Sequence, residues 1–426
     1  MNSWHGRPAR AAKKLHGRGA NATFHATLMH QINNTQPPDP LRADLKSEWL
    51  LDPKITFLNH GSFGCVPKCV FVEQTHWRLR IEADPIEMLG RRRDELLAVS
   101  KRAVGTWLCM QPEDFGLVSN ATEGINAIIR SMKLGAGDEL LTTTHVYHAV
   151  RQAMKFIAGQ SGSAYREIEI PLPIVSPDAV VDQIVSTLSP RTRLLVVDHV
   201  TSPTAVVFPV ARIIAECASR GVDVLIDGAH APGMVPLKVA ELGAAYYAGN
   251  LHKWACAPKG SAFLWVRPDK QPDIHPLIIS HYFGEGFNRE FSWQGTRDMS
   301  NWLSIGHALA FMSELGWDRV MTHNHAMAAW VQRLLCESWN VAPISPADGS
   351  MLGSMATVPL PPPLDRLSQQ EVFVLQQRLH DEFKLEVPIV CWGGRIFVRP
   401  CCQVNNSADE YRRLVTVVNQ LVRETK

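Results

Sequence analysis

The sequence predicts an α/β protein with a large domain built on a mostly parallel sheet and a smaller C-terminal α/β domain. Between residues 115 and 270, short apolar runs of strand length alternate with segments that have the amphipathic spacing of helices. Such alternation is typical of parallel strands joined by crossover helices. A length of 426 residues and an apolar content of 46% are sufficient for two domains.

Six apolar runs mark the expected strands of the large sheet. They are Phe115–Val118, Glu139–Thr143, Leu194–Val200, Val222–Ile226, Ala244–Ala248 and Ser261–Val266. In sheets of this kind, ligands bind beyond the carboxyl ends of the strands. The polar residues that follow these runs are therefore the candidates for a functional site.

The rest of the chain divides into further segments. We expect residues 1–45 to form a basic, disordered extension, because the first 38 positions hold no acidic residue. An over-long start ahead of Met29 and an organellar transit peptide are the alternatives. Residues 46–65 are expected to pack with the small domain. The large domain is expected over 66–310 and the small domain over 311–426.

Charge and cysteine content argue against several classes of partner. The chain has 43 basic and 41 acidic residues and a net charge of +2, so neither nucleic acid nor an anionic membrane is expected as a partner. Nine cysteines, an odd number, favour reduced thiols and a cytoplasmic location. The longest apolar runs are too short to span a bilayer.

Two charged residues that follow predicted strands define the expected chemistry. Asp227 ends the run that begins at Val222, and Lys253 follows the run that ends at Ala248. A lysine amine forms a Schiff base with an aldehyde, and a buried carboxylate keeps a pyridine nitrogen protonated, so that the ring withdraws electrons. The pair predicts a pyridoxal 5'-phosphate (PLP) site, without a metal. A helix-capping aspartate and a surface lysine are the alternatives.

Other polar segments are expected at the same edge of the sheet. Ala121 and Thr122 open a helix after a strand, and the free amides of a helix N-terminus bind phosphate; simple capping is the alternative. Tyr147, after the next strand, is the candidate to stack on the pyridine ring. We expect His230 to bond the phenolic oxygen of the ring and His252 to reach the phosphate.

Six motifs carry a resemblance to a known family. They are Phe57-Leu-Asn-His-Gly-Ser-Phe-Gly64, Asn120-Ala-Thr-Glu-Gly-Ile-Asn126, Asp227-Gly-Ala-His-Ala-Pro-Gly233, His252-Lys-Trp254, Trp293-Gln-Gly-Thr-Arg-Asp298 and Val398-Arg399. From about residue 48 to the C-terminus, the chain resembles the class V aminotransferase family of fold-type I PLP enzymes, and within it the isopenicillin N epimerase-like group. The resemblance implies a seven-stranded sheet and a homodimer.

The resemblance also implies roles for residues at matching positions. Lys253 would carry the Schiff base and move the proton at the substrate's Cα. Thr296 would reach the phosphate bound by the other subunit. Arg399 would bind the substrate carboxylate as a fork, and Asn59 and His60 would line the substrate pocket. A solvated arginine on an edge strand is the alternative for Arg399.

The match is weaker on the substrate side. After Arg399 the chain reads Pro-Cys-Cys-Gln-Val-Asn-Asn406, where relatives often carry a small polar residue and a Tyr-Asn pair. Cys391 lies near the position of the mobile-loop cysteine of cysteine desulfurases. Its neighbours predict a buried strand, in which cysteine is a small apolar side chain, so we do not assign it a persulfide.

The expected substrate is an amino acid, and three reactions share the same core residues. Reprotonation of Cα on the opposite face gives epimerisation, which is our first hypothesis because the resemblance lies there. Loss of a β-substituent gives a C–S lyase, such as a cysteine desulfhydrase or a cysteine-conjugate or sulfoxide lyase, and transamination is third. No residue can be named as the acid opposite Lys253. A PLP-binding regulator without catalysis is a further alternative, although no DNA-binding pattern precedes the fold.

Overall fold

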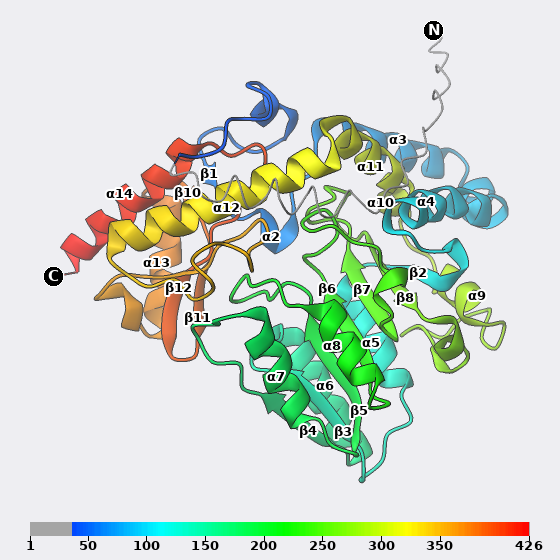
Figure 1. The fold of residues 1–426 in the computed structure, drawn as a ribbon. Helices are drawn as coiled ribbons and strands as arrows, with labels where there is room; N and C mark the ends of the chain where they lie inside the picture. The colour runs from blue at the N-terminus through cyan, green and yellow to red at the C-terminus, as the bar shows by residue number, and fades with distance from the viewer. Residues whose placement is uncertain (1–35, 426) are drawn as a thin grey trace, which may run out of the picture.

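The computed structural model describes residues 36–425, and its large domain is a seven-stranded sheet covered by helices (Figure 1). The strand order is β2-β8-β7-β6-β5-β3-β4, and β8 runs antiparallel to both of its neighbours while the other pairs are parallel. The predicted α/β class with a mostly parallel sheet is confirmed.

Each of the six apolar runs overlaps a strand of this sheet, and one strand was not expected. The strands are β2 (Phe115–Val118), β3 (Glu139–Thr143), β4 (Ala164–Ile168), β5 (Thr192–Asp198), β6 (Asp223–Gly228), β7 (Tyr246–Asn250) and β8 (Ala262–Val266). The sequence of β4 is Ala-Tyr-Arg-Glu-Ile, without an apolar run, because it is an edge strand that is only partly buried.

Helices cover both faces of this sheet. They include α3 (Lys68–Ala83), α4 (Arg93–Leu108), α5 (Ala121–Ser131), α6 (His148–Ser161), α7 (Pro177–Thr187), α8 (Val210–Ala218), α9 (Phe287–Ser292), α10 (Ser300–Leu303) and α11 (Ile305–Leu315). Alternate residues of β5 enter different cores: Leu195 and Val197 pack with α7 and α8, and Leu194 and Val196 with α5 and α6. The central strands are therefore apolar throughout, and their polar residues lie at their ends.

The small domain is built around the long helix α12 (Trp317–Trp339), which crosses the upper part of Figure 1. Its sheet has the antiparallel order β11-β12-β9, and β1 pairs with β10 in parallel. The elements are β1 (Thr56–Phe57), α2 (His60–Phe63), β9 (Val358–Pro359), α13 (Gln369–Asp381), β10 (Leu385–Glu386), β11 (Ile389–Trp392), β12 (Arg395–Val398) and α14 (Ala408–Glu424). Ser368 and Ser407 begin α13 and α14 with capping boxes.

Short helical turns complete the described chain: η1 (Leu45–Glu48), η2 (Glu87–Arg91), η3 (Pro112–Asp114), η4 (Ala240–Leu242), η5 (Pro268–Asp273) and η6 (Leu364–Arg366). The predicted extension over 1–45 lies largely outside the described residues, and Leu45 at its end is buried in one core with Trp49. The strand β1, which lies in the segment 46–65, pairs with β10 of the small domain. The domain boundary at residue 310 stays a prediction.

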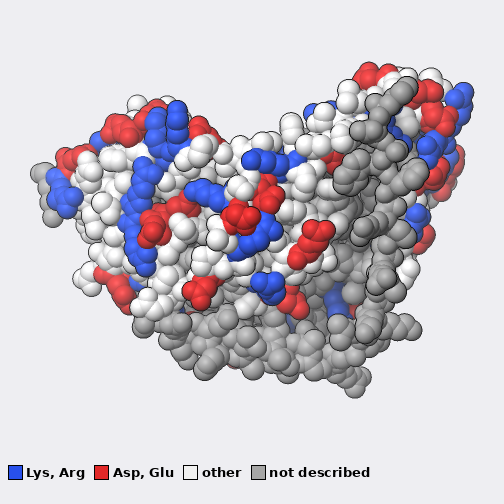
Figure 2. Space-filling model, turned by 90° about the horizontal axis from the view of Figure 1, so that it is seen from above, with Lys and Arg blue, Asp and Glu red and all other residues white. Residues whose placement is uncertain are grey.

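Figure 2 shows Lys and Arg side chains interspersed with Asp and Glu on the described part of one face. Among residues 36–425, none of the helices has the length and apolarity needed to cross a membrane.

Candidate active site

A cavity of about 460 Å³ lies at the carboxyl ends of the central strands. Its lining includes seven of the residues predicted from the sequence: Ala121, Thr122, Tyr147, Asp227, His230, His252 and Lys253. These residues come from the ends of separate strands and the beginnings of the segments that follow them. The parallel topology brings them together, as expected for a sheet of this kind.

Lys253 lies in the turn after β7, half-buried, with Nζ 3.1 Å from Nε2 of His230. Burial, together with the charge of Arg399, lowers the pKa of Lys253 to about 8. The neutral amine, which a nucleophile requires, is therefore more populated near neutral pH than it is in an ordinary lysine.

Asp227 and Asp198 form a pair of buried carboxyl groups at the ends of β6 and β5. They are register partners on adjacent strands, with exposures of 3% and 2%. The Asp227 Oδ1 accepts a hydrogen bond from the Ala229 amide at 3.0 Å, whereas the Asp198 Oδ2 has no partner among the described residues. Burial raises the pKa of both groups, and the charge of Asp227 raises that of Asp198 further.

Two carboxyl groups in one buried site do not both ionise. We infer that the pair carries one negative charge, on Asp227, and that Asp198 keeps its proton. Asp198 is not among the residues predicted from the sequence, because it lies inside the run Leu194–Val200, whose pattern predicts a strand. An acidic residue within a buried apolar strand was the available signal.

Replacing Asp198 by Asn is expected to stabilise the cofactor-free protein at neutral pH. An unfolded aspartate has a pKa of about 3.9, and the folded pKa is raised well above that. Such a group contributes stability below the unfolded pKa and loses it as pH rises towards the folded pKa. Asparagine has no such loss, so Asp198→Asn should raise the free energy of unfolding at pH 8.

Urea unfolding at pH 8 and pH 4.5 tests this expectation. The gain should be smaller at pH 4.5, because this pH lies close to the pKa of about 3.9 of an unfolded aspartate. A gain that is equal at the two pH values would contradict a raised pKa at Asp198.

The beginning of α5 lies on another side of the cavity. Asn120 caps this helix by accepting the Glu123 amide at 2.9 Å, and the Ala121 amide donates to Oδ1 of Asn250 at 2.8 Å. The capping that we gave as the alternative is therefore present at Asn120, and the Ala121 amide already has a partner. Thr122, next in the first turn, is left as the better donor to a phosphate. Asn250 ends β7 and was missed, since a polar residue two positions after an apolar run has no distinct signal.

His252 has one ring nitrogen committed to the backbone. Its Nδ1 lies 3.0 Å from the Ser261 carbonyl, which only accepts, so Nδ1 carries a proton. Burial lowers the pKa of His252 to about 4. The neutral ring therefore presents a bare Nε2, and a phosphate held there would require a second proton, which the anion's charge favours.

Arg399 is buried with an unsatisfied guanidinium. Only 6% of it is exposed, one terminal nitrogen donates to the carbonyl and hydroxyl of Ser202, and Nε has no partner among residues 36–425. Burial lowers the pKa of Arg399, an effect that Cys401 and Tyr147 partly offset. The alternative of a solvated edge arginine is wrong. A substrate carboxylate would supply the missing acceptor and charge, and Ser202 lines the cavity.

Asn59 and His60 lie beside the cavity but do not line it. The Asn59 side chain donates to Glu386 at 2.8 Å, and the His60 Nε2 lies 3.0 Å from the Lys253 carbonyl. Ser62 and Phe63 of the same segment line the cavity instead. The substrate roles of Asn59 and His60 stay predictions, and their observed contacts hold the surrounding backbone.

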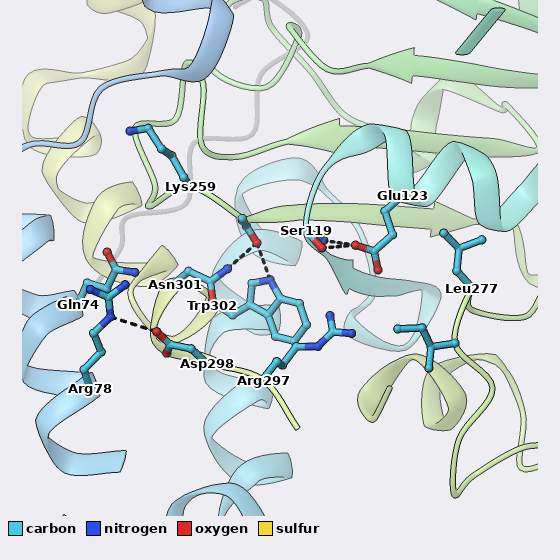
Figure 3. A pocket seen from close by; sticks show the side chains of 12 residues that line it. Gln74, Arg78, Ser119, Glu123, Lys259, Leu277, Arg297, Asp298, Asn301 and Trp302 are labelled. Carbon is cyan, nitrogen blue, oxygen red and sulfur yellow. Dashed lines mark hydrogen bonds and ion pairs between the residues drawn. The ribbon is translucent and has the colours of Figure 1, made fainter. Parts of the chain in front are cut away.

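A second pocket of about 590 Å³ adjoins the first and shares Ser119, Lys259 and Gly260 with it (Figure 3). Arg297 and Leu277 contribute side chains to this pocket. Thr296 precedes Arg297 and is exposed outside the first cavity. Within one chain, Thr296 does not join the other predicted cofactor residues.

Cys391 differs from its prediction. It lies on β11 as a strand residue, but its side chain is exposed rather than buried. Partial burial of the thiol nevertheless raises the pKa of Cys391. The thiol is therefore not activated as a thiolate. The prediction of a buried position was wrong because β11 begins an exposed hairpin, in which alternate side chains face solvent.

The residues of the cavity suit PLP. A buried anion, Asp227, matches a protonated pyridine nitrogen, and a half-buried amine, Lys253, matches an aldehyde. The start of α5 suits a phosphate. The Oδ2 of Asp198, which has no hydrogen-bond partner among the described residues, is also available to a ligand.

Comparisons with known proteins identify the family of the chain. Residues 80–363 match the aminotransferase class-V family. Isopenicillin N epimerase of Amycolatopsis lactamdurans is 32% identical over 397 residues, which cover 89% of this chain and 98% of that protein. A probable chloroplastic L-cysteine desulfhydrase of Arabidopsis thaliana is 31% identical over 404 residues, or 88% and 84% of the two chains.

A solved structure shows the same fold at lower identity. It is a mutant of the cystine C–S lyase C-DES with glycine covalently linked to its PLP cofactor, and it has a TM-score of 0.74 and 20% identity. The match covers 89% of this chain and 99% of that one. The chain therefore belongs to the aminotransferase class-V family and is a PLP-dependent enzyme.

Proposed function

We propose that the protein is an epimerase or racemase that inverts the Cα of an amino acid. The observation that carries this proposal is the placement of two proton-carrying side chains. Lys253 follows β7 and Tyr147 follows β3. The strands β6 and β5, which carry Asp227 and Asp198, lie between β7 and β3 in the sheet. A ligand that lies over the carboxyl pair would therefore have the Lys253 amine on one side and the Tyr147 phenol on the other.

Each cavity residue has a task in this proposal. When bound, PLP withdraws electrons from the Cα of an attached amino acid. The Lys253 amine would hold the cofactor aldehyde and, once released, take the proton from Cα. Asp227 would keep the pyridine nitrogen protonated, and Thr122 and His252 would hold the phosphate. His230 stays a predicted partner of the phenolic oxygen.

Tyr147 would be the second proton carrier. It lies at the start of α6, is 43% exposed, and lies within electrostatic reach of Arg399. That guanidinium would hold the substrate carboxylate. This placement would bring the phenol close to the Cα that carries that carboxylate.

The substitution Tyr147→Phe is expected to uncouple proton exchange from inversion. Lys253 would still exchange the Cα proton of one enantiomer with solvent, but the opposite face would lack its acid. We expect inversion to fall about 100-fold, the usual scale for loss of a general acid. Proton NMR in heavy water measures both rates in one sample.

Tyr165→Phe, on β4 and bonded to Glu167 at 2.6 Å, is the matched control. It removes the same hydroxyl from a residue that does not line the cavity, and its inversion rate should stay near wild type. Undiminished inversion in Tyr147→Phe would contradict the assignment of the second acid.

A C–S lyase is the second candidate, supported by the L-cysteine desulfhydrase relatives. The same NMR experiment separates the reactions when L- and D-amino acids, cysteine, its sulfoxides and its S-conjugates are supplied. Cα deuteration with inversion supports the epimerase. A keto acid with ammonia and a sulfur product would make it a lyase, and a keto acid without ammonia would indicate transamination.

We also propose that the active unit is a homodimer. The second pocket has exposed apolar residues at its rim, Leu277 at 41% and Ile278 at 52%, and it adjoins the proposed cofactor cavity. A second copy would cover these side chains and bring its own Thr296 towards the phosphate. The proposed cytoplasmic location rests on composition alone.

Thr296→Ala is expected to lower PLP affinity about tenfold, because it removes a hydrogen bond to a charged group. Equilibrium dialysis measures the affinity, and sedimentation velocity reports whether the dimer persists. Thr416→Ala, on the exposed face of α14, is the control. Unchanged affinity in a dimeric Thr296→Ala protein would count against binding across the subunits.

A further inference from the structure

We propose that Trp254 is a positioning residue that fixes the proton of His230 on Nε2 and thereby favours the neutral amine of Lys253. The three side chains form a hydrogen-bonded chain at the wall of the cavity. The inference rests on the proposed function only in treating Lys253 as the amine that meets the aldehyde.

The donor and acceptor atoms of this chain fix the position of the protons. The Trp254 Nε1 lies 3.4 Å from Nδ1 of His230, and the His230 Nε2 lies 3.1 Å from Nζ of Lys253. An indole N–H only donates, so the His230 Nδ1 must accept. A neutral histidine with a bare Nδ1 carries its proton on Nε2. That proton points at Nζ, which accepts it only with a free lone pair.

The Trp254 indole is closely packed on several sides. Trp254 is 1% exposed, and its ring lies 5.0 Å from the His60 ring. A Cβ at Gly61 would lie 3.4 Å from the indole and 2.8 Å from the Met355 sulfur, and one at Gly233 would lie 2.7 Å from the Trp254 carbonyl. Both glycines belong to motifs noted in the sequence, and their missing side chains make room for this tryptophan and its backbone.

Electrostatics at the site favour the neutral forms. Burial, followed by the charge of Lys253, lowers the pKa of His230 well below its usual value, so the ring does not become an imidazolium at physiological pH. Burial and Arg399 lower the pKa of Lys253, while carboxylates and a thiol oppose them. The titratable groups that face Lys253 are Asp227, Asp198, Arg399, Cys401, His60, His230 and His252.

Without the indole N–H, the proton of His230 would be free to move to Nδ1. A bare Nε2 would then accept a hydrogen bond from an ammonium group, which would favour the charged lysine. An ammonium group has no lone pair for an aldehyde. Trp254 would thus act on the reactivity of Lys253 without touching the cofactor or the substrate.

The test uses the cofactor-free protein and requires no turnover. Competitive labelling with acetic anhydride across a pH series, followed by peptide mass spectrometry, measures the pKa of Lys253 directly. We expect Trp254→Phe to raise that pKa by about one, which lowers the neutral fraction at pH 7 about tenfold. Trp339→Phe is the control, since it truncates a buried indole whose Nε1 has no partner among the described residues.

An unchanged pKa of Lys253 in a folded Trp254→Phe protein would overturn the proposal. If that variant does not fold, nitrogen NMR of histidine-labelled wild-type protein replaces it, with His230→Gln used to assign the signal. A bare Nδ1 and a protonated Nε2 support the proposal, and the opposite tautomer or an imidazolium overturns it. Neither result depends on PLP binding, so a failure of the proposed function would be recognised separately, by the absence of covalent PLP.

Discussion

Lys253→Ala is expected to abolish the covalent attachment of PLP and all proton chemistry at Cα. Lys253 is the amine of the cavity that combines partial burial, a pKa of about 8 and a hydrogen bond to a neutral histidine. Alanine removes both the nucleophile and the base. We expect Cα exchange to fall by at least about 10,000-fold, at the upper end of the range for loss of a general base. Absorbance of the bound cofactor and deuterium exchange measure the two effects.

Lys238→Ala is the matched control for this substitution. Lys238 lies on the surface, 3.1 Å from Glu241, and does not line the cavity. Its loss should leave both readouts near the wild-type level. Cα exchange within tenfold of wild type in Lys253→Ala would remove Lys253 from the proposed site.

Asp227→Asn is expected to retain PLP but to lose about 1,000-fold in rate, the scale for removing one preorganised charge. Asparagine has nearly the same shape and can keep its contact with the Ala229 amide, so binding should survive. The pyridine nitrogen, however, would no longer face an anion and would lose its proton. Single-turnover kinetics with saturating PLP separate the rate from the occupancy.

Asp223→Asn provides the control within the same strand. Asp223 begins β6 and pairs with Lys270 at 2.5 Å, at the end of the strand away from the cavity. Its rate should remain near wild type. A near-normal rate in Asp227→Asn would show that another carboxylate carries the charge, and Asp198, its register partner, would be the one to test.

The sequence predicts the sheet and the cofactor end of the site well because both depend on local pattern. A parallel sheet needs continuous apolar runs, and its ligand residues must follow them. Asp227 and Lys253 stand out for this reason. The strand β4 was missed because an edge strand does not need an apolar sequence. Asp198 was missed because it lies within the apolar run that predicts β5, and the predicted ligand residues were those that follow such runs.

The substrate end was harder to predict because it depends on contacts between distant segments. Arg399 follows β12 of the small domain but bonds Ser202 of the large domain, a contact that no local pattern reveals. Ser62 and Phe63 line the cavity in place of Asn59 and His60, because the short helix α2 turns successive side chains in different directions. The hydrogen bond from Trp254 to His230 likewise requires the fold.

The most direct measurement is borohydride reduction of the PLP-loaded protein, followed by peptide mass spectrometry. Reduction makes the bond between the aldehyde and its lysine permanent. We predict that the pyridoxyl group is found on the peptide that carries Lys253 and on no other lysine. A label on Lys259, which lines the same cavity, or the absence of any label would contradict the proposed site.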